Sequence, residues 1–196
     1  MTRNGENIVA AAARVACLVF LCGSAAAEGD PAAGKRKTVT CNGCHGQASM
    51  KAVPNLGGQT PGYFVAAMRA YQDGGRAHAT MRDVARILSV REFRDLAAHY
   101  AQPAAEAGAP SSAEAPAPAA ATACSTCHGP GGTEPVTAET PRLAGQKSRY
   151  VGQVLREYRD GTRVHALMNA QARALTDPEI DDLARYFESR AGLFVR

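Results

Sequence analysis

The sequence predicts an all-α protein built from two similar helical domains in tandem. Three observations support this prediction. A set of residues occurs twice along the chain, the apolar residues of each copy recur at helical spacing, and no stretch alternates apolar and polar residues as a half-buried strand would. Each copy spans about 75 residues, a size at which a hydrophobic core alone gives marginal stability.

The repeat is visible in matched motifs. The segment Cys41–His45 returns 83 residues later as Cys124–His128. Pro54–Gln59 returns 87 residues later as Pro141–Gln146, and this second offset then persists almost to the C-terminus. Further pairs at this offset are Tyr63/Tyr150, Tyr71/Tyr158, Arg76/Arg163, His78/His165 and Met81/Met168. Two tandem domains of one fold are therefore expected.

Residues 1–27 have the pattern of a secretory signal peptide. Arg3 and Arg14 flank its start, residues 15–23 form a short apolar run, and residues 25–27 are three alanines that fit a cleavage site. The run is short for a transmembrane helix. An uncleaved anchor and lipidation of Cys22 are the alternatives. The mature chain is expected to work outside the reducing cytosol.

The first domain, residues 28–101, is expected to open with a helix. Asp30 supplies a cap and Pro31 the first helical position of a helix over residues 32–40 that runs into the first cysteine pair. Thr60 and Pro61 open a second helix in the same way. Its apolar face consists of Tyr63, Phe64, Ala67, Met68 and Tyr71, and its counterpart presents Tyr150, Val151, Val154, Leu155 and Tyr158.

Both copies are expected to close with a helix that begins at a capping box. The boxes pair Ser89 with Glu92 and Thr176 with Glu179. Their buried faces would be Phe93, Leu96, Ala97 and Tyr100, then Ile180, Leu183, Ala184 and Phe187. His99 has no counterpart in the second copy and is expected to face solvent.

Residues 102–122 are expected to be a linker before the second domain, residues 123–196. This segment is rich in alanine and proline and contains no aromatic residue. It cannot bury enough apolar surface to fold alone, and its prolines would make it semi-rigid.

Composition excludes a strongly basic nucleic-acid binder, because 22 Lys and Arg residues stand against 18 Asp and Glu residues. The chain has no Trp and 6% aromatic residues, while 45% of it is hydrophobic, much of that alanine. Alanine buries little area per residue, so something besides side chains is expected to help fill the core.

The Cys-x-x-Cys-His motifs indicate that a covalently bound haem c fills each core. The two thiols add to the vinyl groups of the haem, and the next histidine reaches the iron. The predicted attachment residues are Cys41, Cys44, Cys124 and Cys127, and the predicted iron ligands are His45 and His128. A redox-active cysteine pair, a four-cysteine zinc site and two disulfides are the alternatives.

A sixth iron ligand is expected from Met81 and Met168. Met168 is the only methionine of the second copy, and Met81 is the one at the equivalent place in the first. Met50 lies too close to His45 in sequence to reach the opposite face of the haem, and Met68 belongs to an apolar helix face. His78 and His165, three residues before the methionines, compete for the role and would lower the reduction potential.

This set of motifs resembles the dihaem cytochrome c4 family over both copies. The resemblance implies two tandem class I cytochrome c-like domains with His/Met-ligated haems and no enzymatic activity. It also implies that the carbonyl groups of Pro54 and Pro141 accept a hydrogen bond from the proximal imidazoles. Members of this family carry electrons in the bacterial periplasm. The expected partners are redox proteins such as a terminal cytochrome oxidase or a quinol–cytochrome c reductase, with membrane association only through them or through an uncleaved signal.

The chain departs from the family pattern before its second haem motif. Residues 113–123 contain no large apolar residue, so the helix expected there is either lost or reduced to residues 119–123. A loose linker would also weaken the close domain contact of the family. Two further functions remain open: an electron-relay subunit of a larger oxidase or dehydrogenase complex, and a haem peroxidase-type enzyme.

Overall fold

A computed structural model describes residues 29–103 and 115–195 of the chain. The predicted signal peptide and residues 104–114 of the predicted linker lie outside these ranges. Within them the regular structure is helical, and the one β-bridge joins Gly57 to Phe194. None of the helices in the described ranges has the length and apolar character needed to cross a membrane.

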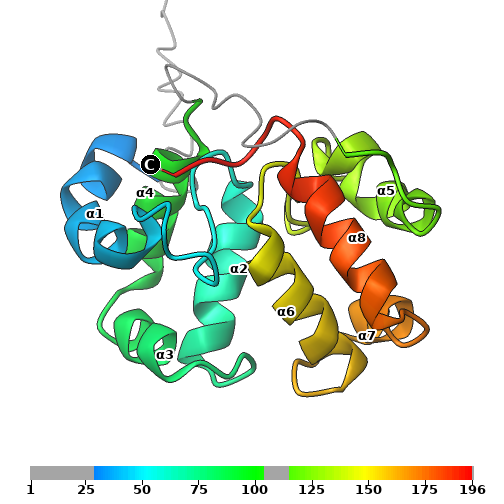
Figure 1. The fold of residues 1–196 in the computed structure, drawn as a ribbon. Helices are drawn as coiled ribbons and strands as arrows, with labels where there is room; N and C mark the ends of the chain where they lie inside the picture. The colour runs from blue at the N-terminus through cyan, green and yellow to red at the C-terminus, as the bar shows by residue number, and fades with distance from the viewer. Residues whose placement is uncertain (1–28, 104–114, 196) are drawn as a thin grey trace, which may run out of the picture.

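The predicted all-α class is confirmed, and each copy forms a small group of helices (Figure 1). The helices of the first copy are α1 (Pro31–His45), α2 (Pro61–Gln72), α3 (Ala79–Arg86) and α4 (Val90–Ala101). Those of the second are α5 (Ala121–His128), the 3₁₀ turn η1 (Pro130–Gly132), α6 (Ser148–Arg159), α7 (Ala166–Ala172) and α8 (Asp177–Glu188).

The helix starts follow the capping signals in the sequence. The Asp30 side chain accepts a hydrogen bond from the backbone N–H of Ala32, and both capping boxes at the starts of α4 and α8 are complete. Helix α1 continues beyond the predicted residues 32–40 and ends at His45. Helices α3 and α7 were not predicted, and they contain Met81 and Met168.

The core of the first domain lies between α1, α2 and α4. Phe93 and Leu96 of α4 are almost fully buried, and Met68 is buried with them, as its helical face predicted. Helix α1 packs closely on α4 because Gly34 has no side chain: a Cβ atom there would collide with the carbonyl oxygen of Asp95. His99 is buried at this contact, so the prediction that it faces solvent is wrong.

The second domain keeps only the end of the corresponding helix. Helix α5 begins at Ala121, inside the range assigned to the linker, and is 8 residues long, whereas α1 has 15. The residues before it are held against the end of α8. The N–H of Ala115 donates to Ser189 Oγ at 3.0 Å, and Arg190 Nη2 donates to the carbonyl oxygen of Ala115 at 2.9 Å. The helix is therefore reduced, close to the second of the two expected outcomes.

The two domains are in close contact, contrary to the expectation drawn from the loose linker. Helices α2 and α6 lie at the centre of the molecule (Figure 1). The last described residues return to the first domain, where Phe194 and Gly57 exchange two backbone hydrogen bonds of 3.0 and 3.1 Å. The N–H of Tyr63 donates to the carbonyl oxygen of Ala138 at 2.9 Å. Linker composition therefore did not determine whether the domains pack.

Candidate functional site

Each cysteine motif lies at the C-terminal end of a helix, α1 or α5, and the helix ends at the histidine. Cys41 and Cys124 are half-buried, while Cys44 and Cys127 are exposed, and all four are free thiols. No group of three His, Cys, Asp or Glu residues within residues 29–103 and 115–195 is arranged to hold a metal ion. The arrangement therefore supports neither a four-cysteine zinc site nor disulfides within the pairs.

The ring of each motif histidine is held at one nitrogen. His45 Nδ1 lies 2.9 Å from the carbonyl oxygen of Pro54, and His128 Nδ1 lies 2.8 Å from that of Pro141. A carbonyl oxygen only accepts hydrogen bonds, so Nδ1 carries the proton and Nε2 is left to bind a metal. Burial lowers the pKa of both histidines, which favours the neutral imidazole that acts as a ligand.

Met81 and Met168 lie in the first turns of α3 and α7, and both side chains are half-buried. The histidines three residues earlier are the N-caps of these helices. His78 Nδ1 accepts the N–H of Met81 at 3.2 Å, and His165 Nδ1 accepts the N–H of Met168 at 3.3 Å. The repeated histidines thus have a structural role that requires no bound iron.

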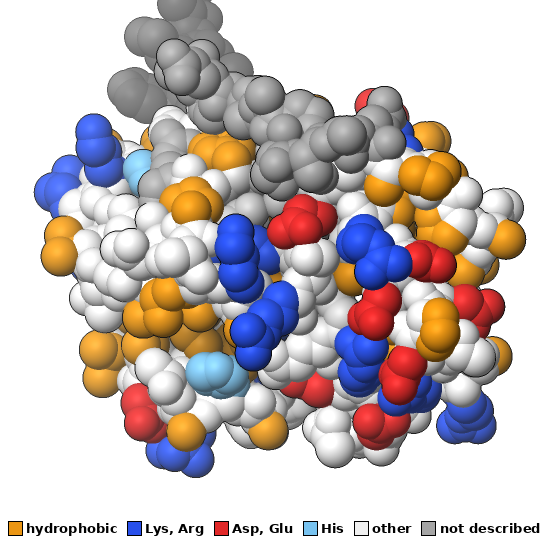
Figure 2. All heavy atoms as spheres, in the orientation of Figure 1, with side chains coloured by type: hydrophobic (Ala, Val, Ile, Leu, Met, Phe, Trp, Pro, Cys, Tyr) orange, Lys and Arg blue, Asp and Glu red, His pale blue; other side chains and the backbone are white. Residues whose placement is uncertain are grey.

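These donor sets fit a covalent haem c. Each domain offers two free thiols, one imidazole with an available Nε2, and one methionine sulfur on a separate helix. The hydrophobic surface fits as well: Figure 2 shows apolar side chains gathered on the first domain between α1 and α3. A flat apolar macrocycle bound there would cover surface that the sparse aromatic residues leave open.

Lys147, the N-cap of α6, was not predicted from the sequence as a residue of the site. This residue is buried in the contact between the domains. Its Nζ donates to the carbonyl oxygens of Gln47 and Met50, at 2.9 and 3.1 Å, in the loop that follows His45. Its counterpart in the first copy is Thr60, and a sequence comparison of the copies would find this difference without showing its partners.

Gln59 and Gln146, two matched residues of the repeat, also have roles that were not predicted from the sequence. Both are buried, and each binds the backbone of the other domain. Their retention in both copies was the available signal.

A cluster of tyrosine and arginine side chains also spans the domain contact. Arg76 Nη2 donates to the Tyr150 hydroxyl at 2.6 Å, and the charge of Arg163 also acts on this hydroxyl. The guanidinium of Arg163 lies over the ring of Tyr158, 4.8 Å from its centroid. Desolvation alone would raise the pKa of Tyr150, but the two guanidinium groups outweigh it and lower this pKa.

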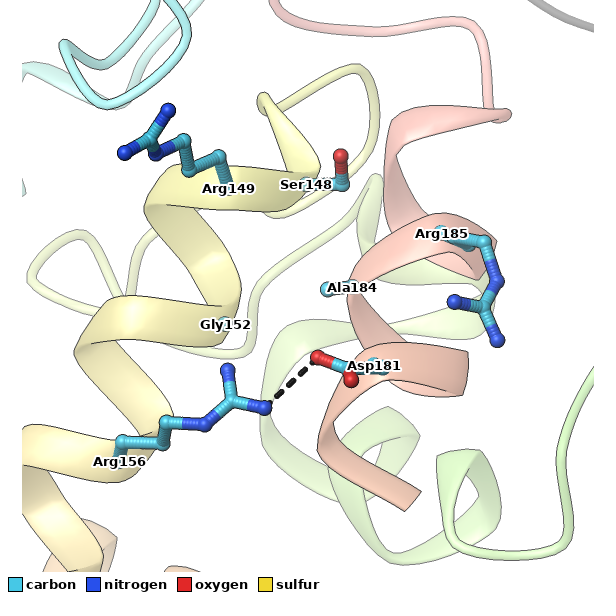
Figure 3. Close-up of a pocket in the computed structure, with 7 residues that line it drawn as sticks. All are labelled: Ser148, Arg149, Gly152, Arg156, Asp181, Ala184 and Arg185. Carbon is cyan, nitrogen blue, oxygen red and sulfur yellow. Dashed lines mark hydrogen bonds and ion pairs between the residues drawn. The ribbon is translucent and has the colours of Figure 1, made fainter. Parts of the chain in front are cut away.

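A surface hollow of about 240 Å³ lies between α6 and α8 (Figure 3). Arg156 and Asp181 face each other across it, with a 2.8 Å hydrogen bond between Nη2 and Oδ1. Its lining residues are Ser148, Arg149, Gly152, Arg156, Asp181, Ala184 and Arg185. They include no thiol, imidazole or methionine, so this hollow is separate from the cysteine motifs.

Comparison with known proteins agrees with this geometry. The Cytochrome c family model matches residues 112–191. Cytochrome c4 of Pseudomonas aeruginosa is 32% identical over 86% of this chain and 92% of its own. The thiosulfate dehydrogenase electron acceptor of Stutzerimonas stutzeri is 32% identical over 76% of this chain and 78% of its own. The crystal structure of reduced cytochrome c4 from Pseudomonas stutzeri superimposes with a TM-score of 0.69, at 25% identity, over 83% of this chain and 99% of that chain. The chain belongs to the cytochrome c4 family, and its two Cys-x-x-Cys-His motifs bind two haem c groups covalently.

Proposed function

We propose that this dihaem electron-transfer cytochrome carries single electrons in the periplasm between a donor complex and a terminal oxidase or reductase. The observation that supports the proposal best is the match between the two domains. Each has a neutral imidazole held by a proline carbonyl, and each has a methionine in the first turn of a histidine-capped helix. The haem iron, once bound, supplies reversible one-electron chemistry.

In this proposal each haem iron would be held by two protein ligands. His45 and His128 would bind through Nε2, while the carbonyl groups of Pro54 and Pro141 fix the ring orientation and raise the basicity of the imidazole. Met81 and Met168 bind through sulfur, which raises the reduction potential relative to two histidines. An iron with two protein ligands offers no position for a substrate, which supports a carrier without enzymatic activity.

The near-infrared spectrum of the oxidised protein tests the methionine ligands. A sulfur-to-iron charge-transfer band of two-haem intensity is expected, and Met81→Ala and Met168→Ala should each remove half of it. Met50→Ala is a matched control, because Met50 is 41% exposed and lies in the loop after His45. An unchanged band in either of the first two variants would exclude that methionine.

Carbon monoxide binding separates the carrier from a haem peroxidase-type enzyme. Such an enzyme needs an iron that is open or that can open. The reduced wild-type protein is expected to bind carbon monoxide slowly and incompletely at neutral pH. Rapid stoichiometric binding at either haem would overturn the proposal.

A second candidate is an electron-accepting or relay subunit of a dehydrogenase complex. The relative from Stutzerimonas stutzeri, named for accepting electrons from thiosulfate dehydrogenase, supports this candidate. Size-exclusion chromatography of a native periplasmic extract distinguishes the two, because a free carrier elutes near its own mass. The same fractionation tests periplasmic export, for which residues 1–27 provide the predicted signal.

A further inference from the structure

Gln146 of the second domain binds the same peptide group that holds His45 in the first domain. The peptide bond between Pro54 and Asn55 contributes both the Pro54 carbonyl and the Asn55 N–H. The carbonyl oxygen lies 2.9 Å from His45 Nδ1, and the N–H donates to Gln146 Oε1 at 2.8 Å. One peptide group therefore links the imidazole of one domain to the side chain of the other.

The second domain repeats this arrangement with the roles exchanged. The carbonyl oxygen of Pro141 lies 2.8 Å from His128 Nδ1. The N–H of the same peptide group belongs to Arg142 and donates to Gln59 Oε1 at 2.9 Å. Each histidine is thus connected through one peptide group to a glutamine of the opposite domain.

Both glutamines are held rigidly in this position. Gln146 and Gln59 are each 5% exposed. Gln146 Nε2 donates back to the carbonyl oxygen of Asn55 at 3.1 Å, and Gln59 Nε2 donates back to that of Arg142 at 3.2 Å. Each side chain amide therefore binds both backbone groups of one residue across the domain contact.

Hydrogen bonds that share a peptide group strengthen one another. When the N–H of a peptide donates to an acceptor, the carbonyl oxygen gains negative charge and becomes a better acceptor, by about 10–30% per bond. A better acceptor on Nδ1–H makes the imidazole more basic toward the iron, and a more basic ligand favours the ferric state.

We propose that Gln146 and Gln59 are positioning residues that tune the reduction potential of the haem in the opposite domain. Gln146 lowers the potential of the first haem through Pro54 and His45. Gln59 lowers that of the second haem through Pro141 and His128. This inference rests on the proposed ligation by the two histidines.

The experiment replaces each glutamine in the haem-loaded protein and measures each haem separately. Gln146→Leu should raise the potential of the first haem and leave the second unchanged, and Gln59→Leu should do the reverse. We expect about a threefold change in the equilibrium constant for reduction. This corresponds to about 28 mV, because a tenfold change is about 59 mV for one electron. Paramagnetic NMR resolves the two haems, with Met81→Ala used to assign the signals of the first.

The NMR signal of the histidine Nδ1–H in the reduced protein gives a second readout. Gln146→Leu should move the His45 signal upfield, as expected for a weaker hydrogen bond, and leave the His128 signal in place. Gln153→Leu is the control: it removes an exposed glutamine whose side chain donates to Glu157, far from both proline carbonyls in sequence, and it should change the potential of neither haem.

A purely structural role for the glutamines predicts a different pattern. Loosening the domain contact would shift the reduction potentials of both haems in Gln146→Leu. That result overturns the inference, as does an unchanged His45 Nδ1–H signal in Gln146→Leu. Failure of the proposed function is recognised separately, because the wild-type protein would then lack two reversible one-electron reductions.

Discussion

Lys147 Nζ lies 2.9 Å from the carbonyl oxygen of Gln47, two residues after His45. A cation from the second domain is therefore buried in the haem loop of the first domain. Burial lowers the pKa of this lysine, and its positive charge in turn helps to lower the pKa of His45. The equivalent residue of the first domain, Thr60, donates its hydroxyl to the carbonyl oxygen of Thr140 in the loop after His128, at 3.3 Å, but it carries no charge. The two haem environments therefore differ in charge although their proposed ligands match.

Replacing Lys147 should lower the reduction potential of the first haem. A nearby positive charge opposes oxidation of the iron, and its loss in Lys147→Met should favour the ferric state by about 1 kcal/mol, or about fivefold in the equilibrium constant. Potentiometric titration with NMR assignment measures this shift. Lys147→Arg keeps the charge and should retain most of the potential.

Lys51→Met is the matched control for the buried lysine. Lys51 is close enough to influence the pKa of Lys147, but it is exposed, so solvent and salt screen its charge. Loss of Lys51 should change the reduction potential of the first haem far less than loss of Lys147. Equal shifts in reduction potential for Lys147→Met and Lys51→Met would contradict the effect assigned to the buried charge of Lys147. Equal shifts of both haems in Lys147→Met would contradict it as well.

Glu92 should make the first domain sensitive to acid. Hydrogen bonds from Lys37 Nζ and from the backbone and hydroxyl of Ser89 lower the pKa of Glu92 to about 2, from an ordinary 4.5. Its stabilising effect is therefore complete above pH 4.5 and is lost as the pH falls toward 2. Urea unfolding at pH values from 7 to 2 measures the free energy of unfolding. As the pH falls, Glu92→Gln should lose less of this free energy than the wild type does.

Glu179→Gln provides the comparison for this pH effect. Glu179 occupies the equivalent capping box, and hydrogen bonds from Thr176 lower its pKa. No lysine donor accompanies it in the described contacts, so its replacement should change the acid response less. If Glu92→Gln and the wild type lose stability in parallel from pH 4.5 to pH 2, ionised Glu92 does not stabilise the protein as predicted.

The local elements were predictable because their signals are local. Capping boxes, a proline at the first helical position and a 3.6-residue apolar period lie within single segments, and they gave α2, α4, α6 and α8. Helices α3 and α7 were missed because they are short and are capped by His78 and His165. Histidine is not among the preferred N-cap residues.

The domain contact was not predictable because its partners are far apart in sequence. Asn55 and Gln146 are 91 residues apart, and Lys147 and Gln47 are 100 apart. The repeat shows that both copies share a fold, but the retained residues do not show which partners they bind across the contact. The linker composition was a poor guide, since the contact is made by the loops after the haem motifs and by the C-terminal residues.

Gly34 and Gly43 should respond in opposite ways to substitution by alanine. A Cβ at Gly34 would collide with the backbone of Asp95, so Gly34→Ala should separate α1 from α4 and destabilise the protein by about 1–3 kcal/mol. A Cβ at Gly43 meets nothing within 4 Å, and the second copy has Thr126 there. Gly43→Ala should stabilise α1 by about 0.5–1 kcal/mol. Thermal unfolding compares the two, and equal effects would contradict the packing described for Gly34.

Removing the Tyr150 hydroxyl should weaken the contact between the domains. Arg76 donates a hydrogen bond to this oxygen, and in Tyr150→Phe its guanidinium loses that partner. Loss of a partner for a buried polar group costs about 1–3 kcal/mol, so the urea midpoint should fall.

Tyr158→Phe is the control, because it keeps the ring beneath Arg163 and should change the midpoint little. The spectra of both variants should still show two low-spin haems, since neither tyrosine is a proposed ligand. A midpoint unchanged in Tyr150→Phe would mean that Arg76 is satisfied without this hydroxyl.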